Sequence, residues 1–322
     1  MEELNLENSN QEIIDIEKLS TKKNEVILDK DNKFKVVEKD YYDIPAISQS
    51  QVKDFLKSPF HFWQNSVFNP NKKEKEMNEG MRLGKICHCL LLEPENFKKE
   101  FGINPSTNFL TKEGKKFKIE QEELKKIAIN QSDVLRATKM IECLKKNKEV
   151  SKFLYGSLTE KPIIIKDKNT GLTLKGKLDC IKRLQTGEII VIDYKTSCDV
   201  NAFLKWGYKE YNYIQIAMYN KLVREKYGRE IDYFYFIIQS TKKDEEEVIC
   251  IADYMQEGIG KYQCILRYGE NKIDEILLKI ADKLEKYEKT KDSLIWSAFE
   301  GIQTLSFHDS MLEEKNQDYE RF

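Results

Sequence analysis

The chain has 322 residues, which is enough for one large domain or two modest ones. Its 54 Lys and Arg residues are balanced by 55 Asp and Glu residues, so the net charge of -1 excludes a generally basic, histone-like protein, and any polyanion must bind at a local patch. A hydrophobic content of 40%, with only 14 Gly and 6 Pro, excludes a low-complexity or collagen-like chain and provides ample material for a core.

The N-terminal part of the chain is acidic and does not resemble a secretory signal. The first 19 residues contain six acidic residues and one lysine, whereas a signal peptide begins with basic residues. No apolar run approaches the roughly 18 residues of a membrane span, and the seven cysteines form neither a CxxC zinc pattern nor an even disulfide framework. We therefore expect a cytoplasmic protein without a membrane partner, in which residues 1–41 form an acidic, flexible segment.

The next part of the chain has the pattern of helices. Ser48 begins a helix, and Gln51 three residues later completes a capping box. The run EGMRLGKICHCLLLEP predicts a buried helix over residues 77–92, closed by Pro94. Two further helices are predicted over residues 113–128 and 132–146, with many lysines on their outer faces.

From Glu160 onward the apolar residues follow the period of β-structure, and a helix interrupts the series of strands. Strands are predicted over residues 162–166, 172–182, 188–195, 232–239 and 247–251, with helices over 211–227 and 253–289. The pattern predicts an α/β (α+β) fold in which helices flank a central mixed sheet, with helical elements at both ends of a single domain over residues 42–322.

The strand over residues 188–195 is the most informative segment. Its apolar run predicts a buried strand, yet it ends in Asp193 and Lys195, which the two-residue period places on the same face. Burying a carboxylate costs several kcal/mol unless it is paired or binds a metal. The preceding strand carries Asp179 and is connected by a short turn, so two carboxylates from adjacent strands can converge.

Two acids and a lysine, spaced D-x13-D-x-K, are the groups that metal-assisted phosphodiester cleavage requires. The acids hold a hard divalent cation through oxygen ligands, and the cation activates a water and offsets charge on the scissile phosphate. The lysine positions the nucleophile or stabilises the transition state. For Asp193 and Lys195 alone, the alternative interpretation is a structural ion pair at a strand end.

Several motifs in a fixed order carry a resemblance to a known group of nucleases. They are YYDIPAISQSQVKDFLKSPFHFW, MRLGKICHCLLLEPENFKKEF, the Asp179 strand followed by DYKTS, then YNYIQIAMYN and FIIQS. In this order they resemble the PD-(D/E)XK superfamily, and within it the nuclease domain of RecE-type exodeoxyribonuclease VIII, which is RecB- and lambda-exonuclease-like. The resemblance covers roughly residue 42 to the C-terminus, so the role of the acidic segment before it stays open.

The resemblance implies a role for each matching residue. Asp179 and Asp193 are expected to bind Mg2+ or Mn2+, with the backbone carbonyl of Tyr194 completing the shell, and Lys195 is expected to be the catalytic lysine. His88, in the run GKICH, matches a histidine that RecB- and RecE-like nucleases use as a further metal ligand. Without this context, a lone histidine in an apolar helix is more often a core residue.

Four other residues have candidate roles with open alternatives. Glu160 resembles an acidic ligand of lambda-exonuclease-like members, but is otherwise a solvated acid at a strand start. Gln215 and Tyr219 match a Q-x-x-x-Y element and share one helical face, from which they could orient Lys195, a metal-bound water or the phosphate strand. Arg82 is a candidate contact for a DNA phosphate, and a surface salt bridge is the competing interpretation.

The resemblance implies a divalent-metal-dependent exonuclease that digests linear double-stranded DNA from the 5′ end and leaves 3′ single-stranded tails for phage or prophage recombination. It also implies double-stranded DNA ends and a RecT-like single-strand annealing protein as partners, a ring-shaped homo-oligomer, and a bacterial or phage-infected cell. The alternatives are a RecB-like repair or defence nuclease with endonuclease or flap activity, a catalytically inactive DNA-binding module, and a protein-binding scaffold built on the lysine-rich helices.

Overall fold

The structure is a computed structural model, and it describes residues 41, 44–73, 77–105, 108–206, 211–253 and 259–297. The acidic segment expected over residues 1–41 therefore lies outside the described residues, apart from Tyr41. Within the described part of the chain, no helix is long and apolar enough to cross a membrane.

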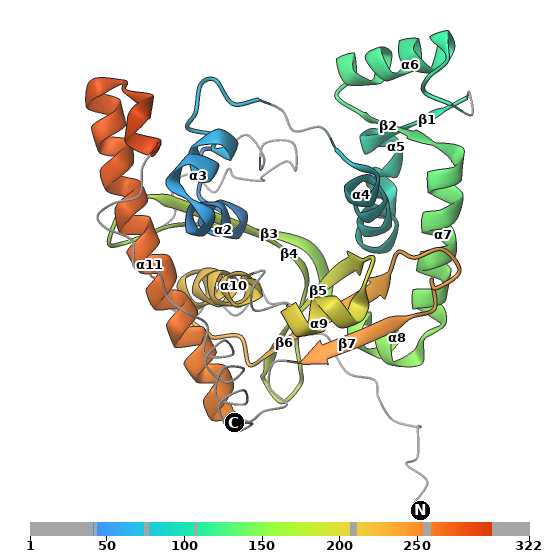
Figure 1. Cartoon of the computed structure of the whole chain (residues 1–322). Coiled ribbons are helices and arrows are strands. Elements are labelled where there is room, and N and C mark those ends of the chain that lie inside the picture. The colour runs from blue at the N-terminus through green and yellow to red at the C-terminus, as the bar shows by residue number, and fades with distance from the viewer. Residues whose placement is uncertain are drawn as a thin grey trace, which may run out of the picture.

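Helices predominate in the first half of the described chain, strands in the second, and a long helix follows the last strand (Figure 1). The helices are α2 Gln49–Lys57, α3 Pro59–Asn65, α4 Glu79–Leu92, α5 Phe97–Glu100, α6 Lys112–Glu123, α7 Gln131–Lys146, α8 Lys148–Leu154, α9 Val200–Trp206, α10 Asn212–Tyr227 and α11 Ile259–Thr290, with short 3-10 turns η2 Pro94–Asn96 and η3 Ser293–Trp296. The strands are β1 Phe101–Asn104, β2 Ile127–Asn130, β3 Leu158–Lys166, β4 Thr173–Arg183, β5 Ile189–Ser197, β6 Tyr233–Ser240 and β7 Ile249–Asp253.

Among the described residues, the main sheet has five strands in the order β3-β4-β5-β6-β7. The β3–β4, β4–β5 and β6–β7 pairs are antiparallel, whereas β5 and β6 are parallel. A parallel pair needs a long crossover connection, and helices α9 and α10 supply it. The predicted α/β fold with a central mixed sheet flanked by helices is therefore confirmed.

Two hydrophobic cores lie on opposite faces of the sheet, because the side chains of the central strand β5 alternate between them. Ile189 and Val191 pack in one core with α2, α3, α10 and α11, and Ile190 and Ile192 pack in the other with α4 and α7. Figure 1 shows these two groups of helices on either side of the strands. A strand covered on both faces needs a continuous apolar run, which is the pattern that the sequence shows before Asp193.

One predicted helix is shorter than expected. The helix predicted over residues 113–128 ends at Glu123, and residues from Ile127 form β2, which pairs in parallel with β1. Lys125 has a φ of +55° and ends the helix: its N–H donates to the carbonyl of Glu122, and the N–H of Lys126 donates to that of Gln121. A helix end of this kind usually has a glycine in the left-handed position. Because a lysine stands there, the sequence did not indicate that the helix ends at this point.

The described residues before α2 are anchored to the edge of the sheet. Ile47 forms a bridge with Leu174 of β4. The Lys175 ammonium donates to the backbone carbonyls of Tyr41 at 2.8 Å and Ile44 at 2.9 Å, and lies over the Tyr41 ring. Helix α2 then begins at the predicted capping box of Ser48 and Gln51. Lys175 thus fixes the entry of the chain into the fold.

Helices α10 and α11 pack closely because of one glycine. A Cβ atom on Gly269 of α11 would lie 2.6 Å from the Ala217 Cβ and 3.1 Å from the Tyr213 carbonyl oxygen, both on α10. Real Cβ atoms essentially never approach that closely, so glycine is required at this crossing.

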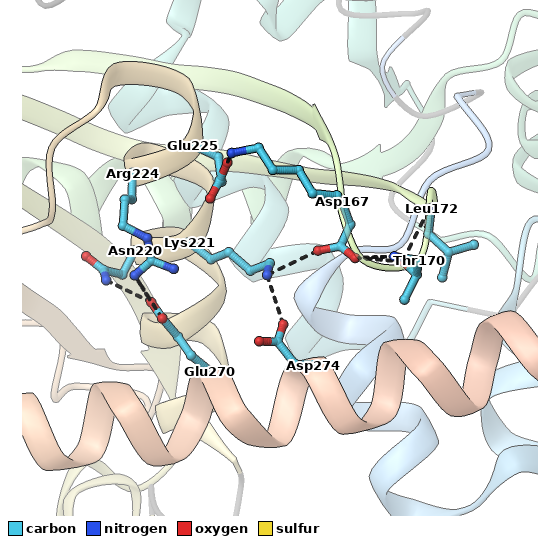
Figure 2. A network of polar contacts seen from close by, with 10 residues as sticks. Asp167, Thr170, Leu172, Asn220, Lys221, Arg224, Glu225, Glu270 and Asp274 are labelled. Atoms are coloured by element: carbon cyan, nitrogen blue, oxygen red, sulfur yellow. Dashed lines mark hydrogen bonds and ion pairs between the residues drawn. The ribbon is translucent and has the colours of Figure 1, made fainter. Parts of the chain in front are cut away.

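An ionic network holds the same two helices together and reaches the β3–β4 turn (Figure 2). The Lys221 ammonium lies 3.1 Å from Asp167 and 2.8 Å from Asp274, and Arg224 lies 2.8 Å from Glu270. Burial acts to raise the pKa of Asp167, but hydrogen bonds from Thr170 and the charge of Lys221 outweigh it, so this pKa lies below its usual range. Asp167 is therefore charged at neutral pH, and its buried charge is compensated by the Lys221 ammonium.

Replacing Lys221 by alanine is expected to destabilise the fold. The variant leaves the buried Asp167 carboxylate without its cation, and removal of one partner of a buried ion pair costs about 3–5 kcal/mol. Urea denaturation should show this loss for Lys221→Ala. Lys272→Ala, which removes an exposed partner of Glu275, should change the free energy of unfolding by less than about 1 kcal/mol. Equal losses in the two variants would contradict this account.

Candidate active site

Asp193 is almost fully buried in the middle of β5, and two groups hold its carboxylate. The residue is 1% exposed. Its Oδ1 accepts a hydrogen bond of 2.5 Å from the Gln215 side-chain amide, and its Oδ2 is ion-paired with Lys195. The predicted sharing of one face by Asp193 and Lys195 thus appears as a direct contact.

Asp179 lies on the neighbouring strand β4, where the β4–β5 ladder ends at the pair of Cys180 and Ile192. Its Oδ2 accepts a hydrogen bond of 2.8 Å from the backbone N–H of Tyr194. Burial, followed by the Asp193 carboxylate, raises the pKa of Asp179 from 3.8 to about 6, although His88, Lys195 and the Tyr194 N–H act in the opposite direction. A buried carboxylate with a raised pKa in an acidic cluster is typical of a functional site.

Helix α4 brings His88 to this carboxylate. The His88 Nδ1 lies 3.5 Å from Asp179 Oδ2, and the His88 ring lies 5.1 Å from that of Tyr194. One helical turn earlier, Gly84 packs against β5, where an added Cβ atom would lie only 3.0 Å from Thr196 Oγ1. The glycine of the RLGKICH run therefore lets α4 approach the sheet closely enough for the histidine to reach the site.

Glu160 reaches the same place from the edge strand β3. The sequence predicted it just before a strand, but β3 begins earlier, at Leu158, so Glu160 lies inside the strand. It lies between the pairs Thr159–Cys180 and Lys161–Leu178 and has a φ of +51°. In the described part of the chain, one ligand atom each from His88, Glu160 and Asp179 lie within 4.8 Å of one another.

This cluster suits a divalent cation by the chemistry of its donors. Two carboxylates and one imidazole provide the oxygen and nitrogen ligands that Mn2+ accepts, and the carboxylates suit Mg2+. The third predicted acid, Asp193, lies beside the cluster, with its carboxylate held by Gln215 and Lys195. Its role as a ligand, and that of the Tyr194 backbone carbonyl, stay predictions.

Lys195 remains a cation in this environment. Burial acts to lower its pKa, but the charges of Asp193 and Asp179 outweigh burial, so the pKa lies above its usual range. The Lys195 side chain is 28% exposed, whereas the Asp193 side chain beside it is 1% exposed. Lys195 is therefore placed to offer positive charge and not to act as a base.

The two candidate residues of α10 have different contacts. Gln215 binds Asp193, as described above. The Tyr219 hydroxyl donates to the backbone carbonyl of Lys177 on β4 at 3.1 Å, and burial raises its pKa well above the usual value, so it stays a donor. Gly176 allows this contact, because an added Cβ atom would lie 3.2 Å from the Tyr219 ring.

Arg82 lies two turns before His88 on α4 and has a protein partner. Its Nε donates to Asp133 Oδ2 at 3.1 Å, and its side chain is 23% exposed. Asp133 also caps helix α7, so this ion pair joins α4 to α7. A contact of Arg82 with a DNA phosphate stays a prediction.

Two residues beside the site had no role predicted from the sequence. The Lys177 ammonium lies 2.5 Å from Glu160 and 3.3 Å from Glu93, and all three side chains are mostly buried. Lys177 stands two residues before Asp179, so the alternation of the strand predicts that both share one face, but it predicts no contact with Glu160 or Glu93. Glu93 stands next to Pro94 at a helix end, and no local signal marked it.

Comparisons with known proteins place the chain in a family. A family model described as a PDDEXK-like domain of unknown function (DUF3799) matches residues 48–298. No curated protein matches the sequence. A crystal structure described as "Putative exonuclease" from Eubacterium rectale has 14% identity and a TM-score of 0.48, covering 89% of this chain and 98% of that one. A structure of SSO0001 has 16% identity and a TM-score of 0.27, covering 59% and 84%.

The family match includes all of the residues that form the site, from Arg82 to Tyr219. The assignment of Asp179, Asp193 and Lys195 as the acids and the lysine of such a domain stays a prediction. The chain therefore belongs to the family of PDDEXK-like domains of unknown function.

Proposed function

We propose that the protein is a divalent-metal-dependent exonuclease that hydrolyses phosphodiester bonds of linear double-stranded DNA. The observation that carries the proposal is the convergence of His88, Glu160 and Asp179 within 4.8 Å, beside the ion pair of Asp193 and Lys195. A scaffold or an inactive module gives no reason to bury these charges together, since each buried charge costs free energy unless a function uses it.

Each residue of the site has its own role in the proposed reaction. His88, Glu160 and Asp179 would hold the Mg2+ or Mn2+ ion. When bound, the ion supplies a polarised water and offsets charge on the scissile phosphate. Lys195 offers its ammonium to the phosphate oxygens, where positive charge stabilises the developing negative charge. Gln215 keeps the Asp193 carboxylate in place beside Lys195.

The finer features of the proposal rest on the resemblance of the sequence motifs to RecE-type nucleases. They are digestion from the 5′ end to leave 3′ tails, a ring-shaped homo-oligomer, and cooperation with a RecT-like annealing protein in phage recombination. A RecB-like repair or defence nuclease with endonuclease or flap activity is the second candidate, because both groups use the histidine that His88 matches, and the Q-x-x-x-Y element that Gln215 matches is that of RecB-like nucleases.

Removing either member of the Asp193–Lys195 pair is expected to abolish cleavage. Asp193→Asn and Lys195→Met each lose charge that the reaction needs, and we expect the rate on linear duplex DNA with Mg2+ to fall by at least about 100-fold. Lys152→Met, at an exposed ion pair with Glu149, should retain the wild-type rate. Wild-type rates in Asp193→Asn would contradict the proposal.

The choice of substrate separates the two candidate nucleases. We expect the wild-type protein to degrade linear duplex DNA and leave closed circular duplex intact, because an exonuclease needs an end. Linear DNA blocked by phosphorothioates at both 5′ ends should resist digestion, whereas blocks at the 3′ ends should not protect it. Gel analysis of labelled strands measures both results, and cleavage of the closed circle would favour the RecB-like candidate.

The raised pKa of Asp179 predicts that its replacement stabilises the metal-free protein. Because the pKa is about 6 in the folded state and 3.8 ordinarily, the contribution of this group to stability is complete below pH 3.8 and is lost as pH rises through 6. Asp179→Asn should therefore raise the melting temperature in EDTA at pH 8 by roughly 2–4 °C, with a smaller difference near pH 4.

The matched control is Asp282→Asn, at an exposed ion pair on α11, which should show no such dependence on pH. Adding Mn2+ at pH 8 should stabilise the wild-type protein and not Asp179→Asn, since a ligand that binds only the folded state stabilises it. A lower melting temperature for Asp179→Asn than for wild type in EDTA at pH 8 would show that the buried charge is already compensated.

A further inference from the structure

Lys177 lies between two carboxylates just outside the candidate metal cluster. Its ammonium is 2.5 Å from Glu160 Oε2 and 3.3 Å from Glu93 Oε1. The three side chains are 13%, 11% and 11% exposed, so this arrangement differs from the exposed ion pairs of α11, which contribute little. A lysine that is this deeply buried between two carboxylates holds both of them in fixed positions.

The backbone of Glu160 shows why its carboxylate needs to be held. A φ of +51° is unfavourable for any residue except glycine, and it occurs here inside the edge strand β3, two residues after its start. Strain of this kind costs about 1–3 kcal/mol and persists only where the surroundings fix the residue. The contact that fixes the Glu160 side chain is the one with Lys177.

Glu93 is itself anchored, so the contacts form a chain. Its Oε2 accepts a hydrogen bond of 2.8 Å from the Asn96 side-chain amide, and its Oε1 faces Lys177. Glu93 also directly follows α4, the helix that carries His88. One helix therefore supplies a candidate ligand directly and, through Glu93 and Lys177, supports a second one on β3.

We propose that Lys177 is a positioning residue that holds the Glu160 carboxylate at the metal site, with Glu93 as its anchor. One carboxylate oxygen of Glu160 binds Lys177, and the other is left to bind the cation. The inference rests on the proposed metal-dependent function and goes beyond it, because it assigns to residues outside the ligand set the control of divalent-cation affinity.

Calorimetric titration with Mn2+ in the absence of DNA tests this role. Loss of a group that orients a metal ligand typically weakens binding by about 10–100-fold, and we expect that loss in Lys177→Met. Lys177→Arg keeps a cation beside Glu160 and should restore most of the affinity. Glu93→Gln should weaken binding less than Lys177→Met. The control is Lys182→Met on the same strand, where the ammonium binds the Lys152 carbonyl, and it should bind Mn2+ as wild type does.

Nuclease assays add a readout that a structural role would not produce. In Lys177→Met, the Mn2+ concentration for half-maximal cleavage should rise by the same factor as the dissociation constant, whereas the rate at saturating Mn2+ should change much less. In Lys195→Met the rate should fall at every Mn2+ concentration. A fall in the rate of Lys177→Met that saturating Mn2+ does not reverse would overturn the positioning role.

The outcomes separate the inference from the function on which it rests. Failure of the wild-type protein to bind Mn2+ would overturn the proposed function. Binding by wild type with an unchanged dissociation constant in folded Lys177→Met would overturn only the inference. Circular dichroism establishes folding, and Lys177→Gln serves as the second removal of the cation. If neither variant folds, Glu93→Gln decides, and wild-type affinity in that variant would overturn the inference.

Discussion

The buried charge of Asp193 is the constraint around which the rest of the structure is arranged. A carboxylate at 1% exposure on a strand covered on both faces is stable only with close partners. Its partners are Lys195 on the same strand and Gln215 on α10, so α10 must lie against this face of the sheet. The close crossing at Gly269 and the ion pairs of Lys221 hold α10 there from the other side.

On the opposite face of the sheet, the packing of α4 positions His88. His88 reaches Asp179 from α4. This helix packs through Leu83, Ile86 and Cys87 against α7 and the even-numbered residues of β5. Gly84 removes the side chain that would keep the helix away from β5. The Arg82–Asp133 pair then fixes the start of α4 to α7. Packing of α4 thus determines where the imidazole lies.

The sequence predicted the parts of the fold and site that depend on local periodicity. The run from Ile189 to Ile192 followed by Asp193 and Lys195 predicted both a buried strand and a charged face, because side chains alternate along a strand. The features it did not predict depend on backbone conformations that the residue type disfavours. Lys125 and Glu160 both have positive φ values, one at a helix end and one inside a strand, without the glycine that normally marks such a conformation. Glu93 escaped prediction because its partner Lys177 lies 84 positions away.

The position of Glu160 on the edge strand β3 has a dynamic consequence. Among the strands of the described residues, β3 pairs with β4 and with no other, as a strand at the edge of a sheet does. Partial opening of such a strand requires less free energy than global unfolding, and such openings are observed as amide hydrogen exchange in native proteins. A cation bridging Glu160 to Asp179 would add a second side-chain link between β3 and β4, beside the ion pair of Glu160 and Lys177. The edge of the sheet would then be most ordered when the cation is bound.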